Sequence, residues 1–209
     1  QPTMSFSLLV DIFRGGLLFD TSAILVTNIP YILLMLLPWH GKETRLWQNL
    51  CQWVFVIING LALAVNLCDS VYFRYTLRRT TITVISEFSN EGNLASIFFT
   101  ETLRHFYLVI IFVIVVWGLF RLYRCSGLEH RKLCWWRYDL ACLLSLLVLT
   151  PFVIAGIRGA FTTAVRPITI SNANQYVIRP TEAALVLNTP FSIYRTIGKA
   201  VFVVPEYYQ

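Results

Sequence analysis

Four long apolar stretches constrain this 209-residue chain more than any other feature of its sequence. They run over residues 21–39, 46–68, 105–123 and 140–157. A helix needs about 17–25 apolar residues to cross the hydrocarbon of a bilayer. Backbone groups in lipid must be paired within their own segment, which favours helices. The sequence therefore predicts an all-α membrane protein, a bundle of about four transmembrane helices, with kinks at the prolines inside the first and fourth stretches.

The composition supports a lipid environment. Hydrophobic residues make up 56% of the chain, charged residues 13%, and the mean hydropathy is +0.63. Soluble domains carry about 25% charged residues, so this chain lacks the polar surface that a soluble fold needs. The net charge of +6 comes mostly from arginines that flank apolar runs. We interpret it as anchoring to anionic lipid and predict no nucleic-acid partner.

Lysine and arginine density predicts the orientation. Residues 39–45 and 121–139 hold seven of the 17 cations, whereas residues 1–20, 69–104 and 158–209 together hold the other ten. The positive-inside rule puts the two short, cation-dense segments in the cytoplasm. The three longer segments, and with them the C-terminus, are then expected to face outward.

Two outward segments carry apolar residues among polar ones. Residues 69–104 predict one or two interfacial helices on the outer leaflet, separated by a break at residues 90–93. Residues 159–209 contain several prolines and predict an extended extracytoplasmic linker, with short helices near 181–187 and 191–199. The domain division that follows is a transmembrane domain over residues 1–158 and a linker over 159–209.

Residues typical of catalysis are scattered. The chain has no Gly-rich phosphate loop and no common hydrolase or metalloprotease motif, and its five cysteines show no zinc-ligand spacing. We therefore predict no catalytic residue, no metal site and no cofactor within these residues. Asn28, Gln52, Asn59 and Asn66 are expected to make hydrogen bonds between helices. The absence of charged residues in the middle of a span argues against a proton-coupled or ion-coupled transporter.

Charged residues near the predicted outward ends of the spans form the candidate site. Guanidinium groups bind phosphate in a bidentate way, so a cluster at the outer leaflet is suited to a phospholipid headgroup. Generic anchoring to headgroups, without specificity, stays open as the alternative. The candidate residues are Arg14, Asp20, Asp69, Arg74, Arg78 and Arg79.

Three segments carry a resemblance that covers essentially the whole chain. They are FRGGLLFDTSAI, NLCDSVYFRYTLRRTT and RPITISNANQYVIRPTEAALVLNTPFSIYRTIGK, of which NTPFSIYRT (residues 188–196) is the most specific. Together they resemble the membrane region of lipoteichoic acid synthase-like proteins, phosphoglycerol transferases of the alkaline phosphatase and sulfatase superfamily. The resemblance implies five membrane helices, a linker and a large extracytoplasmic catalytic domain in the bacterial cytoplasmic membrane.

That catalytic domain would use a threonine nucleophile and a divalent metal, usually manganese, to take a headgroup from a phospholipid. The resemblance implies that the first family helix lies upstream of Gln1 and the catalytic domain downstream of Gln209. A phosphoethanolamine transferase or a hydrolase is equally compatible with the residues present. Two other readings stay open: a non-enzymatic membrane sensor or assembly module, and a small transporter.

Overall fold

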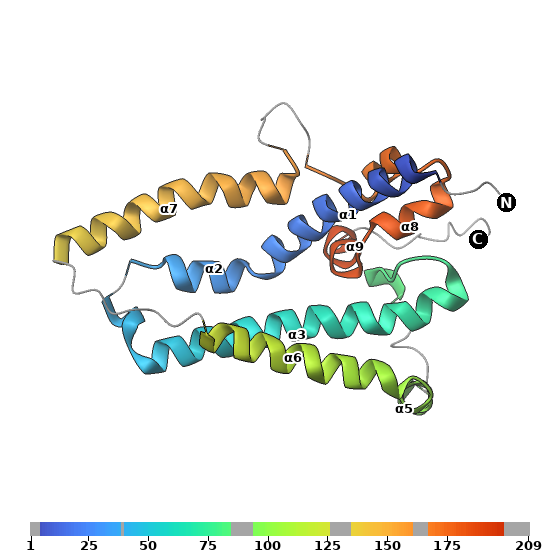
Figure 1. Ribbon diagram of the computed structural model, residues 1–209, viewed down its shortest axis with the longest axis horizontal. Coiled ribbons are helices and arrows are strands. Elements are labelled where there is room, and N and C mark those ends of the chain that lie inside the picture. The colour runs from blue at the N-terminus through green and yellow to red at the C-terminus, as the bar shows by residue number, and fades with distance from the viewer. Residues whose placement is uncertain (1–4, 39, 85–93, 126–134, 161–166, 199–209) are drawn as a thin grey trace, which may run out of the picture.

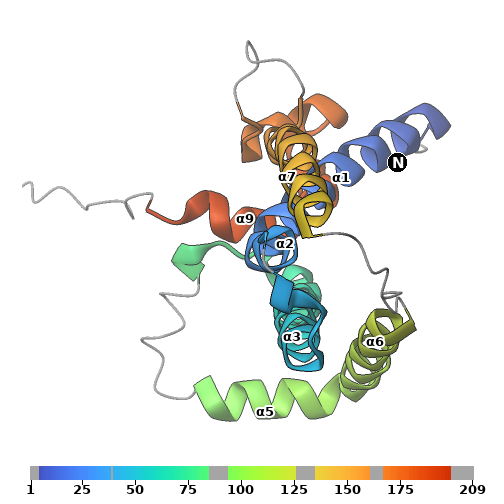
Figure 2. The ribbon, with the colours of Figure 1, turned by 90° about the vertical axis from the view of Figure 1, so that its left-hand side faces the viewer.

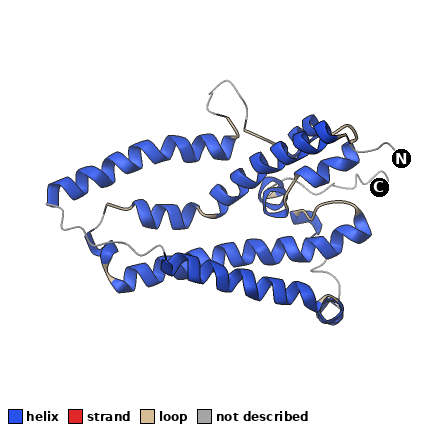
Figure 3. Ribbon diagram, in the orientation of Figure 1, coloured by secondary structure: helices blue, strands red, loops and turns tan. Residues whose placement is uncertain are grey.

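A computed structural model describes residues 5–38, 40–84, 94–125, 135–160 and 167–198. Every regular element in these ranges is a helix, and none of the described residues forms a strand (Figure 3). Three helices are long and apolar enough to cross a membrane, and a fourth span results if the bent pair α1 and α2 counts as one. The long helices α1, α3, α6 and α7 run roughly along one long axis (Figure 1), as expected for a membrane bundle of about four spans.

The first candidate span is a broken helix. Helix α1 covers Phe6–Thr27, α2 covers Ile29–Leu36, and the two are bent by 59°. Pro30 lies in the first turn of α2, where it cannot continue the hydrogen-bond ladder of α1. Asn28 stands at the break and exchanges amide hydrogen bonds of 3.0 and 2.8 Å with Asn59. The kink predicted from Pro30 is present. The amide pair of Asn28 and Asn59 connects the break to α3.

The other candidate spans match the predicted stretches within two residues at four of their six ends. Helix α3 covers Arg45–Thr76, α6 covers Phe106–Cys125 and α7 covers Trp135–Arg158. Pro151 lies inside α7 without ending it. The short 3-10 helix η1, His40–Glu43, joins α2 to α3. Helix α3 runs eight residues past the predicted end at Cys68, and α1 begins fifteen residues before the predicted start at Thr21.

Two pairs of helices form the bundle. Helix α1 packs mainly against α7, α3 packs against α6, and α2 lies between α3 and α7 (Figures 1 and 2). On one side of the bundle, Gln48 accepts a hydrogen bond of 3.0 Å from the Tyr123 hydroxyl, and Gln52 donates one of 3.2 Å to the Phe120 carbonyl. These contacts make α3 and α6 antiparallel and confirm that polar residues in the spans bind between helices.

Helix α5, Leu94–Arg104, lies crosswise to α3 and α6 at one end of the bundle (Figure 2). Its position within residues 69–104 agrees with a predicted outward helix, while its location at a membrane interface stays a prediction. The predicted break at residues 90–93 lies outside the described residues.

The tail differs from the predicted extended linker. Its helices are η2 (Ile170–Tyr176), η3 (Pro180–Glu182), α8 (Ala183–Val186) and α9 (Thr189–Thr196). The last three lie close to the two short helices predicted in this region. Instead of extending away from the bundle, they fold onto α1 and α3, because their apolar residues supply most of a buried core. We call residues 168–196 the tail cap.

Candidate functional site

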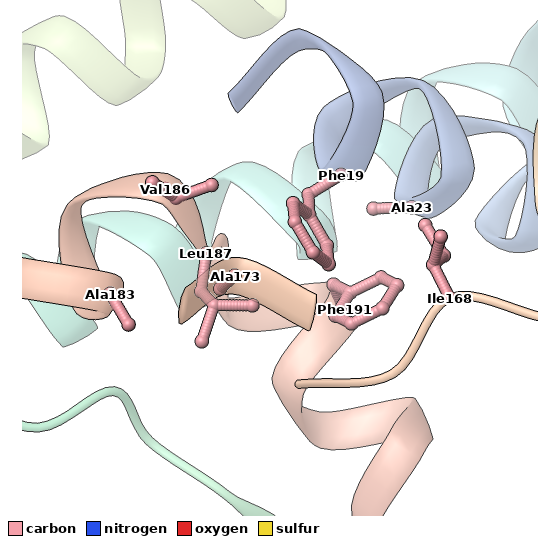
Figure 4. Close-up of a cluster of buried hydrophobic side chains, with 8 residues drawn as sticks. All are labelled: Phe19, Ala23, Ile168, Ala173, Ala183, Val186, Leu187 and Phe191. Atoms are coloured by element: carbon pink, nitrogen blue, oxygen red, sulfur yellow. The ribbon is translucent and has the colours of Figure 1, made fainter. Parts of the chain in front are cut away.

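Apolar side chains hold the tail cap on the first helix. Phe19 of α1 is fully buried between two aromatic rings of the cap, with centroid distances of 4.8 Å to Phe191 and 6.5 Å to Tyr176. Both ring pairs are edge-to-face, a favourable arrangement. The buried cluster combines two residues of α1 with six of the cap (Figure 4): Phe19, Ala23, Ile168, Ala173, Ala183, Val186, Leu187 and Phe191.

The local sequence of the cap explains its short helices. Asn188 caps α9, since its side-chain oxygen accepts a hydrogen bond of 2.8 Å from the Phe191 amide, and Pro190 fits the first turn. Thr169 and Asn172 form the corresponding reciprocal pair at the start of η2. The motif that is most specific in the sequence, residues 188–196, is thus the capped helix that places Phe191 in the core.

A buried carboxylate ties the end of α3 to the cap. Asp69 is 1% exposed and accepts hydrogen bonds from the Arg79 guanidinium at 2.8 Å, from the Thr80 amide at 2.7 Å and from the Thr80 hydroxyl. Leu77 makes this possible, because its positive φ of 53° ends α3 and turns the chain back toward Asp69. The Nε of Arg79 also donates a hydrogen bond of 2.8 Å to the carbonyl of Ala184 on α8. We call Asp69, Arg79 and Thr80, with the Ala184 carbonyl, the Asp69 clamp.

Further hydrogen bonds attach α9 and its cap residue to the bundle. The side-chain amide of Asn188 donates a hydrogen bond of 2.6 Å to the carboxylate of Asp20 on α1. The backbone amide of Thr189 donates one of 3.3 Å to the side-chain oxygen of Asn66 on α3. The Ser22 hydroxyl lies 3.1 Å from the hydroxyl of Tyr194. Ser22 also donates 2.9 Å to the Ile157 carbonyl, which connects this point to α7. Segments more than 100 residues apart therefore meet at one end of the bundle.

This end extends past the spanning part of the bundle. Helix α3 has 32 residues and is about 48 Å long, whereas the hydrocarbon core is about 30 Å thick. In the antiparallel pair, the start of α6 is level with the part of α3 near Asp69. The Asp69 clamp therefore lies where α6 begins, and the last turns of α3 project beyond it.

The six predicted site residues fall into two groups. Asp69, Arg79 and Asp20 make contacts within the protein, and Asp69 is closed to a headgroup in this arrangement. Arg14, Arg74 and Arg78 are exposed, and their guanidinium groups have no partner among the described residues. The sequence could not separate the buried pair from the cations that are unpaired among the described residues, and binding of a headgroup by these residues stays a prediction.

Sequence reasoning missed several residues of the clamp and cap. Thr80, Asn188, Thr189 and Tyr194 contact α1 or α3 across the bundle, and none was singled out as a site residue. For Asn188, Thr189 and Tyr194 the only signal was the Asn-Thr-Pro start of residues 188–196, and no sequence pattern pointed to Thr80. Among the described residues, no group of three or more His, Cys, Asp or Glu side chains is placed to hold a metal ion.

Two adjacent glycines provide a matched test of how tightly the cap fits. A Cβ on Gly15 would lie 2.6 Å from the ring of Tyr176 and 2.8 Å from Val186, whereas a Cβ on Gly16 would meet nothing within 4 Å. Gly15→Ala is expected to destabilise the protein by about 1–3 kcal/mol through overpacking. Gly16→Ala should be neutral or stabilising by up to about 1 kcal/mol. Thermal unfolding in detergent micelles measures both, and equal stability of the two variants would contradict the packing of η2 and α8 on α1.

No family model matches this chain, and no match was found among curated proteins or solved structures.

Proposed function

We propose that this chain is the membrane-embedded part of a cell-envelope transferase that moves phosphoglycerol, or phosphoethanolamine, from phospholipid headgroups. Its role is to anchor and position a catalytic domain of the alkaline phosphatase and sulfatase type, which supplies the threonine nucleophile and the divalent metal. Two features support the proposal: the resemblance of residues 188–196 and their neighbours, and the apolar helices that can span a membrane.

The observation that carries the proposal is the tail cap held by the Asp69 clamp. A flexible segment of about 38 residues between Arg158 and Thr196 would have a root-mean-square reach of about 35 Å. Over its described residues the tail instead packs against α1 and is hydrogen-bonded to α3. A domain that continues from α9 would therefore stay close to the leaflet at this end, where lipid headgroups lie. An enzyme whose substrate is a headgroup gains from this restriction, because it lowers the entropic cost of meeting the substrate.

The test is to read the gene beyond the codon for Gln209 and to assay its full product. Purified membranes containing the product would be incubated with a fluorescent phosphatidylglycerol and with the phosphatidylethanolamine of identical acyl chains. Release of diacylglycerol that requires a divalent metal supports the transferase, and the preferred donor identifies the headgroup. Absence of turnover on both lipids, together with a gene that encodes no downstream domain, would reject the proposal.

Arg78 tests whether the exposed arginines contact the lipid. Its side chain is exposed and unpaired among the described residues, unlike Arg79 in the clamp. Because a cation near an anionic surface contributes about 1 kcal/mol, Arg78→Gln in the full-length protein is expected to reduce kcat/KM on the lipid donor about fivefold. Turnover of a soluble phosphodiester should stay unchanged.

Arg45→Gln is the matched control, since it removes the same charge from the exposed first turn of α3 at the opposite end of the bundle. Its kcat/KM on the lipid donor should equal that of the wild type. An equal loss in both variants, or a loss on the soluble ester, would contradict a headgroup contact at Arg78.

A second candidate is a non-enzymatic membrane module. The acidic and basic side chains that meet in the clamp, Asp69 and Arg79, are engaged with each other and with backbone groups. A rigid cap on a membrane bundle suits an assembly or sensor subunit as well as an anchor. The gene test separates the two, because this candidate requires no catalytic domain downstream.

Among the described residues, the broken helix α1–α2 is a feature typical of a transporter. In transporters, the groups freed at such a break bind the substrate or the coupling ion. Here the Asn28 amide bonds to Asn59 and to the Ile24 carbonyl, so the break is closed by the protein itself. This contact supports a structural role for the kink.

A further inference from the structure

An open apolar groove runs between α1 and α7. It has a volume of about 490 Å³, and its walls come from Leu17, Thr21 and Leu25 on one helix and from Phe152, Ala155 and Gly156 on the other. Small residues of α7 leave the hollow, while the close approach of Leu25 to Gly156 holds the two helices together beside it. Among the described residues, no charged side chain other than Arg14 lines the groove.

The groove has the length of one leaflet. Along α1 it extends from Arg14 to Leu25, eleven residues or about 16 Å. Half of the hydrocarbon core of a bilayer is about 15 Å. Leu25 lies less than one turn from the break at Asn28, in the middle of the span, and Arg14 lies at the end that carries the tail cap. The groove therefore runs from the depth of acyl-chain ends to the depth of headgroups.

Arg14 places a positive charge at one end of the groove. Its guanidinium is exposed and has no partner among the described residues. Asp11, one turn earlier on α1, is exposed and is not within ion-pair distance of it. A free guanidinium at headgroup depth, above an apolar channel, is complementary to a phosphate attached to an acyl chain.

We propose that this groove binds one anionic phospholipid, with an acyl chain between α1 and α7 and its phosphate at Arg14. The proposal uses only these two helices and goes beyond the proposed function, since it holds whether or not a catalytic domain follows. The bound lipid would fill the hollow between two helices whose direct contacts lie to one side of it.

Native mass spectrometry of the 209-residue chain in detergent tests the proposal, with phosphatidic acid and phosphatidylcholine of identical acyl chains as probes. The wild type is expected to bind one phosphatidic acid about tenfold more tightly than phosphatidylcholine. Arg14→Gln should reduce this preference to twofold or less. Arg45→Gln, which removes an exposed arginine at the opposite end of the bundle, should leave it at about tenfold. An equal preference in the two variants overturns the assignment of the phosphate to Arg14.

Filling the groove tests the acyl-chain part. Thr21→Phe should abolish binding of both lipids, whereas Ile24→Phe, at an exposed site of α1 outside the groove, should bind like the wild type. Thr21 lies near α7, so a phenylalanine there also challenges the packing of the two helices. A second measurement therefore does not depend on whether Thr21→Phe folds. A photoreactive benzoylphenylalanine at Phe152 should crosslink phosphatidic acid, and one at the equally exposed Ile154, outside the groove, should crosslink little. Similar crosslinking at both positions overturns the proposal.

Discussion

Replacing Arg79 with leucine is expected to lower the free energy of unfolding by about 3 kcal/mol. The substitution removes the only cation that contacts the Asp69 carboxylate among the described residues, and that carboxylate has a fully buried side chain. A buried charge left without its partner is strongly destabilising, usually by about 3–5 kcal/mol. We expect the lower end of that range, because the two hydrogen bonds from Thr80 remain.

Arg78→Leu is the control for this prediction. The two arginines are neighbours, but Arg78 is exposed and its guanidinium has no partner among the described residues. Its loss should change stability by no more than about 0.5 kcal/mol. The double variant Asp69→Leu with Arg79→Leu should be more stable than Arg79→Leu alone, because it removes the uncompensated charge. If Arg79→Leu and Arg78→Leu are equally stable in thermal unfolding, the clamp does not stabilise the fold.

Replacing Phe191 with alanine is the second change with a large expected effect. Phe191 is fully buried, and its ring contacts those of Phe19 and Tyr194 at centroid distances of 4.8 and 5.1 Å. Truncation of a buried phenylalanine costs about 3–5 kcal/mol. Because this ring joins the cap to α1, the loss should appear first as release of the cap.

Limited trypsin digestion measures this release. Arg195 is half-buried and lies over the rings of Phe191 and Tyr194 at 5.8 and 5.4 Å. Cleavage after Arg195 should be slow in the wild type and at least tenfold faster in Phe191→Ala. Phe13→Ala removes the same ring from a site on α1 that is 69% exposed, and should be cleaved at the wild-type rate. If Phe191→Ala resists trypsin as well as Phe13→Ala does, the cap is held by other contacts.

Both large predictions bear on the proposed function. If the cap holds a catalytic domain near the leaflet, the full-length Arg79→Leu and Phe191→Ala proteins should lose activity on lipid more than activity on a soluble phosphodiester. Gly16→Ala, which leaves the cap unchanged, should keep both activities. A loss of activity on lipid that exceeds the loss on a soluble phosphodiester would distinguish a positioning role of the cap from general unfolding.

Hydrophobicity predicted the ends of a candidate span best where the helix is least buried within the protein. None of the apolar window of α6 is buried, and α6 matched its predicted stretch within two residues at each end. The largest difference is the start of α1. Its first turns hold Asp11, Arg14 and Asp20, so a search for apolar stretches begins only at Thr21. The helix extends to Phe6 because Gly15 and Phe19 pack against the tail cap.

The sequence by itself determined the class of this protein: an all-helical chain with about four apolar helices that can cross a membrane, with kinks predicted at Pro30 and Pro151. Those properties depend on local composition and on the need to pair backbone groups in lipid. Only the tertiary structure decided that Asp69 and Arg79 form a buried clamp, that Arg14 and Arg78 stay free, and that the tail is a packed cap. The reason is physical: the clamp and cap join residues of α1 and α3 to residues more than 100 positions later, and no local pattern records which distant partners will meet.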